Sequence, residues 1–365
     1  MKKTTYQSLL IATSAVLMLS GSLFADGHSK ASENPLNLKG DLRIRQQVES
    51  QDSTTSRSRS RIRFRLGGSN AVSEDTKVSF GLATGGTDPR STNQTLQNSS
   101  QTPDIRLDYA YVTHKFPDQF TVMAGKMKNP LYRPSDLLWD SDINPDGLAV
   151  TFKSKDSKID WSVIGGYFIL DELSDDTKDP YLLAIQPSID WKLDETTTAR
   201  TTVSYYVSQN LEGNTLDNSA SSNTLGTSGY DEDFATLVTS AQIDFKDVYG
   251  LELVRPFAEF VINTNKDDDN KGGIVGVKFG HKKVKEKCKW QSTISYRYLA
   301  TDAWLDTFPD SDAYGGATNA EGLEVELKYG LSKHSSIGVD VYSMNKINGV
   351  KDAQTITQLD LIVKF

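Results

Sequence analysis

Residues 36–48 read L-N-L-K-G-D-L-R-I-R-Q-Q-V, and this stretch decides the fold. Alternate residues of a β-strand point to opposite faces. Here one face would be mainly apolar and the other polar: Leu36, Leu38, Gly40, Leu42, Ile44 and Val48 against Lys39, Asp41, Arg43, Arg45 and Gln47. A strand of this kind separates an apolar environment from water.

The same period of two recurs along the rest of the chain. No apolar run beyond the N-terminus approaches the roughly 18 residues of a membrane-spanning helix, and the mean hydropathy is −0.46. Transmembrane barrels are the class in which so polar a chain crosses a bilayer, because only every second residue faces lipid. We therefore predict an all-β transmembrane antiparallel β-barrel of about 16 strands. The other fifteen segments lie near 57–67, 76–86, 104–115, 120–127, 147–153, 158–169, 181–192, 197–208, 235–246, 254–263, 273–280, 287–299, 322–330, 335–346 and 354–365.

The gaps between these segments alternate between short and mostly long. Outer-membrane barrels have tight periplasmic turns and long extracellular loops, and an even strand number returns both ends of the barrel to the periplasm. The expected turns are 70–75, 116–119, 154–157, 193–196, 247–253, 281–286 and 331–334, and the longer loops include 87–103, 128–146, 209–234 and 300–321. Aromatic residues at strand ends would form interfacial girdles: Trp161, Trp191, Tyr206 and Trp290.

The N-terminus predicts export. Residues 1–25 combine Lys2 and Lys3 with an apolar stretch from Leu9 to Leu19, as in a cleaved secretory signal peptide. Residues 26–365 would then form one barrel in the outer membrane of a Gram-negative bacterium. Cys288 is the one cysteine, so no internal disulfide forms, and a net charge of −8 makes nucleic acid an unsuitable partner.

The final segment carries four apolar residues on one face: Leu359, Leu361, Val363 and Phe365. A phenylalanine at the end of an alternating strand resembles the signal by which the barrel-assembly machinery recognises outer-membrane proteins. The alternative fold is a secreted soluble β-sandwich or β-solenoid, which also alternates, and this ending favours the barrel over it.

The sharpest local feature is a ladder of arginines on one face of a single strand. Its members are Arg57, Arg59, Arg61, Arg63 and Arg65, and Arg43 and Arg45 share its parity on the preceding strand. Arginine on the lipid face near the midplane costs about 2 to 4 kcal/mol each, so we expect the ladder to face the lumen. A basic wall in a narrow channel attracts anions. The alternative is a structural role in which Asp108, Glu324, Glu326 and Asp360 neutralise the arginines.

The loop 128–146 mixes apolar residues with Asp136, Asp140 and Asp142. An exposed loop would be uniformly polar, so we expect this loop to fold into the barrel with its aspartates facing the arginine ladder. Such opposed charges would orient dipolar solutes. The alternative is a loop packed against a neighbouring subunit or the barrel rim.

Several motifs resemble those of the putative porins of proteobacteria, a family related in architecture to the general diffusion porins. They are G-D-L-R-I-R near residue 40, the arginine ladder, L-A-T-G-G and S-T-N-Q-T in 82–95, A-G-K-M-K-N-P at 124–130, L-L-W-D-S-D-I-N-P-D-G at 137–147 and R-P-F-A-E-F at 255–260. The resemblance covers nearly the whole mature chain. It implies a sixteen-stranded barrel, a homotrimer as one candidate assembly, and passive transport, but it supplies no substrate.

Enzymatic and metal sites are not indicated. No G-x-S-x-G elbow occurs, and Asp267, Asp268, Asp269 and Asn270 lack the carboxylate that a calcium loop needs, since Lys278 stands there. We therefore predict no catalytic residue, metal or cofactor. The leading hypothesis is a water-filled channel for passive diffusion of small polar or charged solutes, with outer-membrane lipid and lipopolysaccharide as its surroundings. The alternatives are a substrate-selective channel, a surface receptor or adhesin, and a barrel with a plugged lumen.

Overall fold

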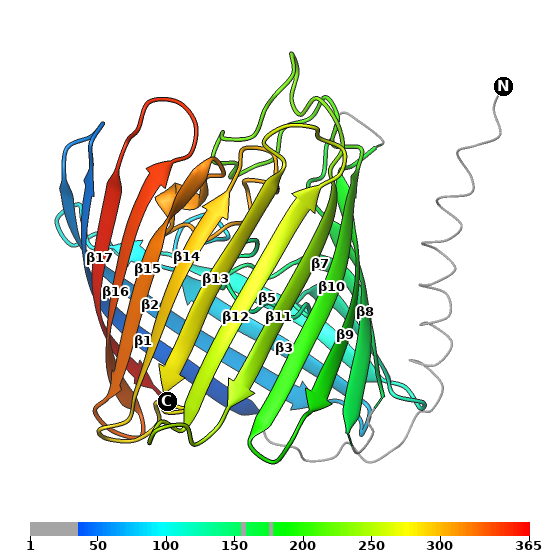
Figure 1. The fold of residues 1–365 in the computed structure, drawn as a ribbon, viewed down its shortest axis with the longest axis vertical. Helices are drawn as coiled ribbons and strands as arrows, with labels where there is room; N and C mark the ends of the chain where they lie inside the picture. The colour runs from blue at the N-terminus through cyan, green and yellow to red at the C-terminus, as the bar shows by residue number, and fades with distance from the viewer. Residues whose placement is uncertain (1–35, 155–157, 175–177) are drawn as a thin grey trace.

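A computed structural model describes residues 36–154, 158–174 and 178–365, so the predicted signal peptide lies outside the described residues. The chain forms a closed antiparallel β-barrel (Figure 1). Its strands are β1 (Asn37–Gln51), β2 (Arg57–Ala71), β3 (Thr76–Thr84), β4 (Gln94–Thr95), β5 (Ile105–Lys115), β6 (Phe120–Lys126), β7 (Asp146–Ser154), β8 (Ile159–Ile169), β9 (Tyr181–Lys192), β10 (Thr197–Gln209), β11 (Ala235–Phe245), β12 (Leu253–Asn263), β13 (Lys271–Gly280), β14 (Trp290–Leu299), β15 (Ala320–Gly330), β16 (Ser335–Lys346) and β17 (Gln354–Lys364).

Sixteen of these strands form the wall, which confirms the predicted count. Each wall strand pairs with its neighbours in chain order, and β1 closes the barrel by pairing with both β2 and β17. The two-residue β4 belongs to the loop after β3 and pairs with Arg61 and Ile62 of β2. Within the described residues the one helical element is a 3₁₀ turn, Tyr314–Gly316, and none of their helices is long and apolar enough to cross a membrane.

The connections alternate in length as predicted, with short turns at one end and mostly longer loops at the other (Figure 1). Several strand boundaries differ from the predicted ones: β2 ends at Ala71 instead of residue 67, for example, and β14 begins at Trp290 instead of residue 287, so the turn before it covers 281–289. Cys288 has a φ of 66°, outside the extended region. Its N–H donates to the carbonyl of Gly330 at 3.0 Å, so residues 286–289 fold across the end of β15 instead of extending β14.

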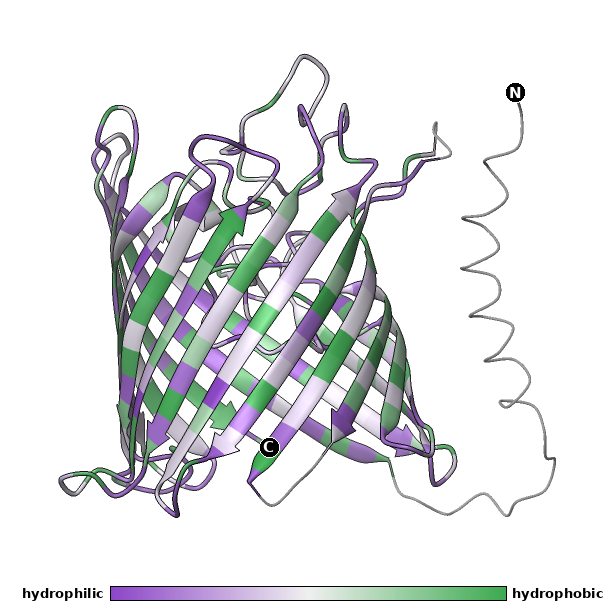
Figure 2. Ribbon diagram, turned by 45° about the vertical axis from the view of Figure 1, so that its right-hand side comes forward, coloured by the Kyte–Doolittle hydropathy of each residue, from purple (hydrophilic) through white to green (hydrophobic). Residues whose placement is uncertain are grey.

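The outer face of the wall is apolar, as alternation requires. Leu359, Leu361, Val363 and Phe365 are between 39% and 59% exposed on this face, and Figure 2 shows hydrophobic and hydrophilic residues alternating along the strands. The prediction that Tyr206 belongs to an interfacial girdle is wrong. Tyr206 is buried inside the barrel against Trp139 and Trp304. Its position near a strand end does not reveal which face it occupies.

A second apolar region lies inside the barrel. The loops 127–145 and 300–319 pack with the inner sides of β8 to β14, and coil segments are visible within the barrel in Figures 1 and 2. Its largest members include Trp139, Phe168, Leu182 and Trp304, each 2% exposed or less. This apolar core therefore fills part of the lumen beside β8 to β14, and the arginines of β1 and β2 lie outside it.

The barrel seam closes at Phe365. The backbone of Gly40 exchanges two hydrogen bonds with Phe365, at 2.8 and 3.0 Å, and the Phe365 ring stacks on Phe64 at 6.1 Å. A side chain at position 40 would meet that ring at 2.5 Å and the carbonyl oxygen of Arg65 at 2.6 Å. Glycine is therefore required here for close approach.

Candidate functional site

The predicted basic wall lies on two neighbouring strands. In the β1–β2 register Arg43 lies opposite Arg63, and Arg45 lies opposite Arg61. Arg45 and Arg63 are buried, at 5% and 8% exposure, whereas Arg57 at the loop end of β2 is exposed. Because the apolar residues between the arginines face outward, the guanidinium groups share the lumenal side.

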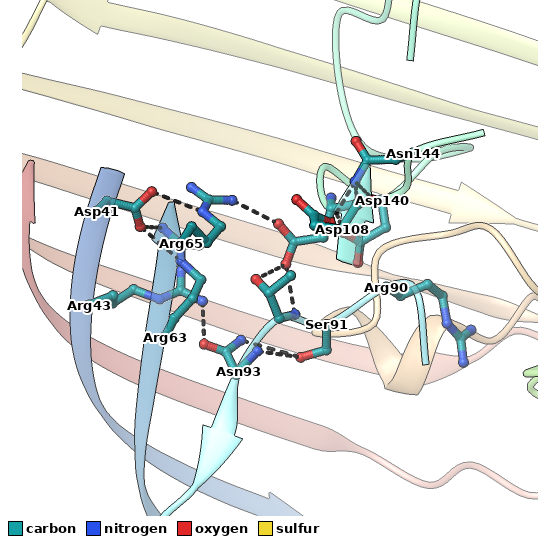
Figure 3. Close-up of polar contacts among 12 residues, drawn as sticks. Asp41, Arg43, Arg63, Arg65, Arg90, Ser91, Asn93, Asp108, Asp140 and Asn144 are labelled. Atoms are coloured by element: carbon teal, nitrogen blue, oxygen red, sulfur yellow. Dashed lines mark hydrogen bonds and ion pairs between the residues drawn. The ribbon is translucent and has the colours of Figure 1, made fainter. Parts of the chain in front are cut away.

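Carboxylates neutralise most of the wall. Arg45 donates from Nε to Asp360 at 2.7 Å and pairs with Asp312 at 3.0 Å. Asp41 accepts from both Arg63 and Arg65 (Figure 3). The remaining pairs are Arg59 with Glu49 at 2.9 Å and Arg65 with Asp142 at 3.2 Å.

The sequence suggested four carboxylates that could neutralise the arginine wall. Of these four, only Asp360 pairs with an arginine of the wall. The other three lie beside different cations: Asp108 pairs with Lys128, Glu324 with Arg297 and Glu326 with Lys328. The partners actually used come from β1 itself, from β17 and from two loops. They depend on strand register and loop packing, which residue parity does not reveal.

The exposed Arg57 has no carboxylate within 4.0 Å among the described residues, and two arginines deeper in the wall are also less completely neutralised. Arg61 contacts Gln47 at 3.1 Å and Ser91 at 3.4 Å, and no carboxylate among the described residues lies within 4.0 Å of it. Arg43 donates to Asn93 at 2.5 Å and lies 3.5 Å from Asp360 (Figure 3). The Nε–H groups of both arginines have no hydrogen-bond acceptor within the part of the chain that the structure describes.

The loop predicted to fold inward does lie in the lumen, over residues 127–145. Leu137 and Trp139 are almost fully buried, and the Trp139 ring stacks on Phe308 at 4.4 Å. The N–H of Asp140 donates to the carbonyl of Phe308 at 2.7 Å. Loop 127–145 is therefore joined to loop 300–319 inside the barrel.

The three predicted acids of this loop separate in space. Asp142 faces the ladder, since it pairs with Arg65 and accepts from the N–H and hydroxyl of Thr92. Asp136 faces β14, where it accepts from Arg297 at 2.8 Å. Asp140 instead holds the two loops together, accepting from the N–H of Ser311 at 2.9 Å.

The environments of two of these acids shift their pKa values in opposite directions. Burial alone would raise the pKa of Asp142, but the nearby Arg65 and Arg63 hold it below its ordinary value. Burial and the adjacent Asp142 raise the pKa of Asp140 well above its ordinary value. Asp142 therefore supplies a negative charge at neutral pH.

Several residues at this site were missed from the sequence. Loop 85–104 reaches the arginines through Ser91 and Asn93, and loop 300–319 contributes Asp310 and Asp312. The motif S-T-N-Q-T at 91–95 marked the first loop without indicating a role. Nothing in the second loop distinguishes its acids from solvent-exposed ones.

These groups surround a polar cavity of about 530 Å³. Arg43, Arg63 and Arg65 line one side, and Asp136, Glu326 and Asp340 are among the acids that line it elsewhere. Within 36–154, 158–174 and 178–365, no group of three or more His, Cys, Asp or Glu side chains has metal-binding geometry. The arrangement presents opposite charges to any solute that enters the cavity.

Comparison with known proteins supports a channel fold. A family model described as "Putative porin" matches residues 19–241 and 228–365. OprB of Pseudomonas putida superposes with a TM-score of 0.60 at 12% identity, over 90% of this chain and 94% of that one. The outer membrane channel DcaP of Acinetobacter baumannii gives 0.52 at 16% identity over 93% and 99%, and Salmonella typhi OmpF gives 0.54 at 12% over 91% and 98%. No curated protein sequence matches the chain.

Proposed function

Because the chain belongs to the putative porin family, whose members form channels and are not enzymes, we propose that it is a passive diffusion channel for small polar or charged solutes. It has the fold of an outer-membrane porin. The observation that carries the proposal is the polar cavity of about 530 Å³ beside the arginine wall, in a lumen whose other side is packed and apolar. Water and solutes would pass along the polar side.

The charges around this cavity suggest how solutes are selected. Most wall arginines are paired, so the wall as a whole is less positive than its seven arginines suggest. Apart from the exposed Arg57, Arg43 and Arg61 keep the least compensated charge of the wall and would give a modest preference for anions. The arginines line one side of the cavity, and Asp136 and Glu326 line other parts of it. These opposite charges would orient dipolar solutes during passage.

Planar-bilayer recording tests the channel itself. We expect purified protein to produce stable conductance steps that grow with salt concentration, because the path is water-filled. Absence of conductance at every voltage would overturn the proposal. Homotrimer formation, contacts with lipopolysaccharide and recognition by the barrel-assembly machinery stay predictions beside it.

Reversal potentials in a salt gradient test the arginine wall. The variant R43Q/R61Q removes the two least compensated charges beyond the exposed Arg57 and should move the reversal potential toward cation preference. R106Q is the matched control, because Arg106 is 46% exposed in its side chain and does not line the cavity. An unchanged potential in R43Q/R61Q would show that these arginines do not line the conducting path.

A further inference from the structure

Lysines gather at the short-turn end of the barrel. Eight strands run toward this end, and all of them except β2 have a lysine at the strand end or within two residues of it. Two of the strands that start from this end, β1 and β3, have a lysine close to their first residue. We name these nine the lysine collar: Lys39, Lys77, Lys115, Lys153, Lys192, Lys246, Lys278, Lys328 and Lys364.

The collar lies on the lumenal face. Alternate residues of a strand share a face, and each collar lysine shares parity with an inward residue of its own strand. Lys192 follows the parity of the buried Gln186, Lys153 that of Ala149 and Lys77 that of Ser79. Lys278, Lys328 and Lys364 also line the polar cavity from its periplasmic side.

Seven of the nine have no carboxylate within 4.0 Å among the residues that the structure describes: Lys39, Lys77, Lys115, Lys153, Lys246, Lys278 and Lys364. Lys192 and Lys328 are paired, with Asp160 and Glu326. Lys246 contacts only the carbonyl oxygen of Glu195, at 3.4 Å. The collar therefore keeps most of its positive charge.

The opposite end of the barrel has the opposite charge. Within the described residues, the long loops between strands carry 22 Asp and Glu against six Lys and Arg. Loops 210–234 and 300–319 contain nine of these acids and neither Lys nor Arg. An axial charge difference therefore runs from an acidic extracellular end to a basic periplasmic mouth.

We propose that the lysine collar is a binding site for polyvalent anions at the periplasmic mouth, and that it makes conduction asymmetric. This rests on the proposed channel for its electrical readout. Like charges around a low-dielectric opening concentrate counter-ions, and flexible ammonium groups suit phosphate or sulfonate oxygens without demanding one geometry. A polyvalent anion can contact several collar lysines at once, whereas a monovalent one cannot.

The collar lies nearer the periplasmic end of the barrel than the arginine wall. Lys39 lies four residues before Arg43 along β1, which is about 13 Å in a strand. The two sets adjoin at Arg65, because Asp41 lies opposite Arg65 and Lys39 lies opposite Gly67 in the β1–β2 register. A ligand on the collar would therefore act on ions entering from the periplasm before they reach the rest of the wall.

The test is block of single-channel current by inorganic tripolyphosphate added to one side at low salt. Biotin attached to the exposed Cys288 of turn 281–289 identifies the periplasmic side. Streptavidin is too large to pass the channel, so it binds this biotin only when it is added to that side. We expect block from the periplasmic side at a concentration about tenfold or more below that needed from the other side. We also expect larger current when the extracellular side is positive, because cations then enter from the acidic end and anions from the basic end.

Three variants make the test specific. Changing to Gln the six collar lysines other than Lys192, Lys246 and Lys328 should remove the side-specific block and the current asymmetry. The triple variant K39Q/K77Q/K364Q should weaken both, and it serves if the sixfold variant does not fold. K271Q/K346Q/K351Q is the control, because it removes three lysines at the long-loop end and should keep both effects.

Each outcome decides one proposal. Equal block from both sides, or block that survives loss of the collar, overturns the collar site and leaves the channel standing. Absence of any conductance overturns the channel instead. In that case calorimetry of tripolyphosphate binding to the detergent-solubilised protein still tests the collar, and equal binding by native and collar-variant protein overturns it.

Discussion

Asp310 shows how a single buried acid can govern the contact between the lumenal loops. It is 6% exposed, its Oδ1 accepts from the N–H of Asp312, and its Oδ2 has no hydrogen-bond partner. Burial and the nearby Asp136 raise its pKa well above the ordinary value, although Arg297 lies 3.6 Å away. Folding therefore favours the protonated form of Asp310 relative to the unfolded chain.

A raised pKa has a definite consequence for stability. The contribution of Asp310 is fully present below its ordinary pKa of about 3.9 and is lost as pH rises through the raised value. We expect hydrogen exchange in residues 306–312, corrected for intrinsic rates, to be slower at pH 5 than at pH 8. D310N should flatten this dependence because asparagine carries no titrating charge. D217N is the control, since Asp217 is exposed in loop 210–234, and a D310N profile identical to the native one would contradict the assignment.

The strands were predictable and the loop contacts were not, for a physical reason. A membrane-spanning strand must alternate, because lipid and water lie on its two sides, and this constraint is written locally in segments such as 36–48. The contact between Asp140 and Phe308 joins residues 168 positions apart and leaves no local pattern. The apolar composition of loop 128–146 predicted its burial, but not its partner loop.

The last strand allows packing to be separated from recognition. Phe365 is 59% exposed and its main ring contact is Phe64, so removal of the ring should cost about 1 kcal/mol of packing. We therefore expect F365A to refold in detergent almost as well as the native protein, yet to give much less heat-modifiable folded protein in cell membranes. L323A, which changes an outward-facing leucine of β15 outside the C-terminal strand, is the control. Equal loss in detergent and in cells would place the effect at the seam instead of at the barrel-assembly machinery.

For the molecule as a whole, the width of the channel depends on the lumenal apolar core. Trp304 is fully buried between Trp139 and Tyr206, and its Nε1–H donates to the carbonyl of Leu138 at 2.6 Å. Truncating it should cost about 3 to 5 kcal/mol and release loops 127–145 and 300–319 from the inner wall. We expect W304A to raise single-channel conductance. W161A, which changes an outward-facing tryptophan, should leave it unchanged, and equal conductance in W304A would contradict a core that limits the path.

The lumenal loops and the strand wall of this barrel are stabilised by different forces. Outside, apolar side chains face lipid tails that are as apolar as they are, so the hydrophobic effect does not hold them to the wall. Inside, loops 127–145 and 300–319 bury Trp139 and Trp304 away from water, as in a soluble protein. Release of the loops should therefore show a positive heat-capacity change and respond to urea and to cooling. The strand wall, whose backbone hydrogen bonds lie in hydrocarbon, should respond far less. Temperature and denaturant would therefore change the width of the channel before they unfold the strands.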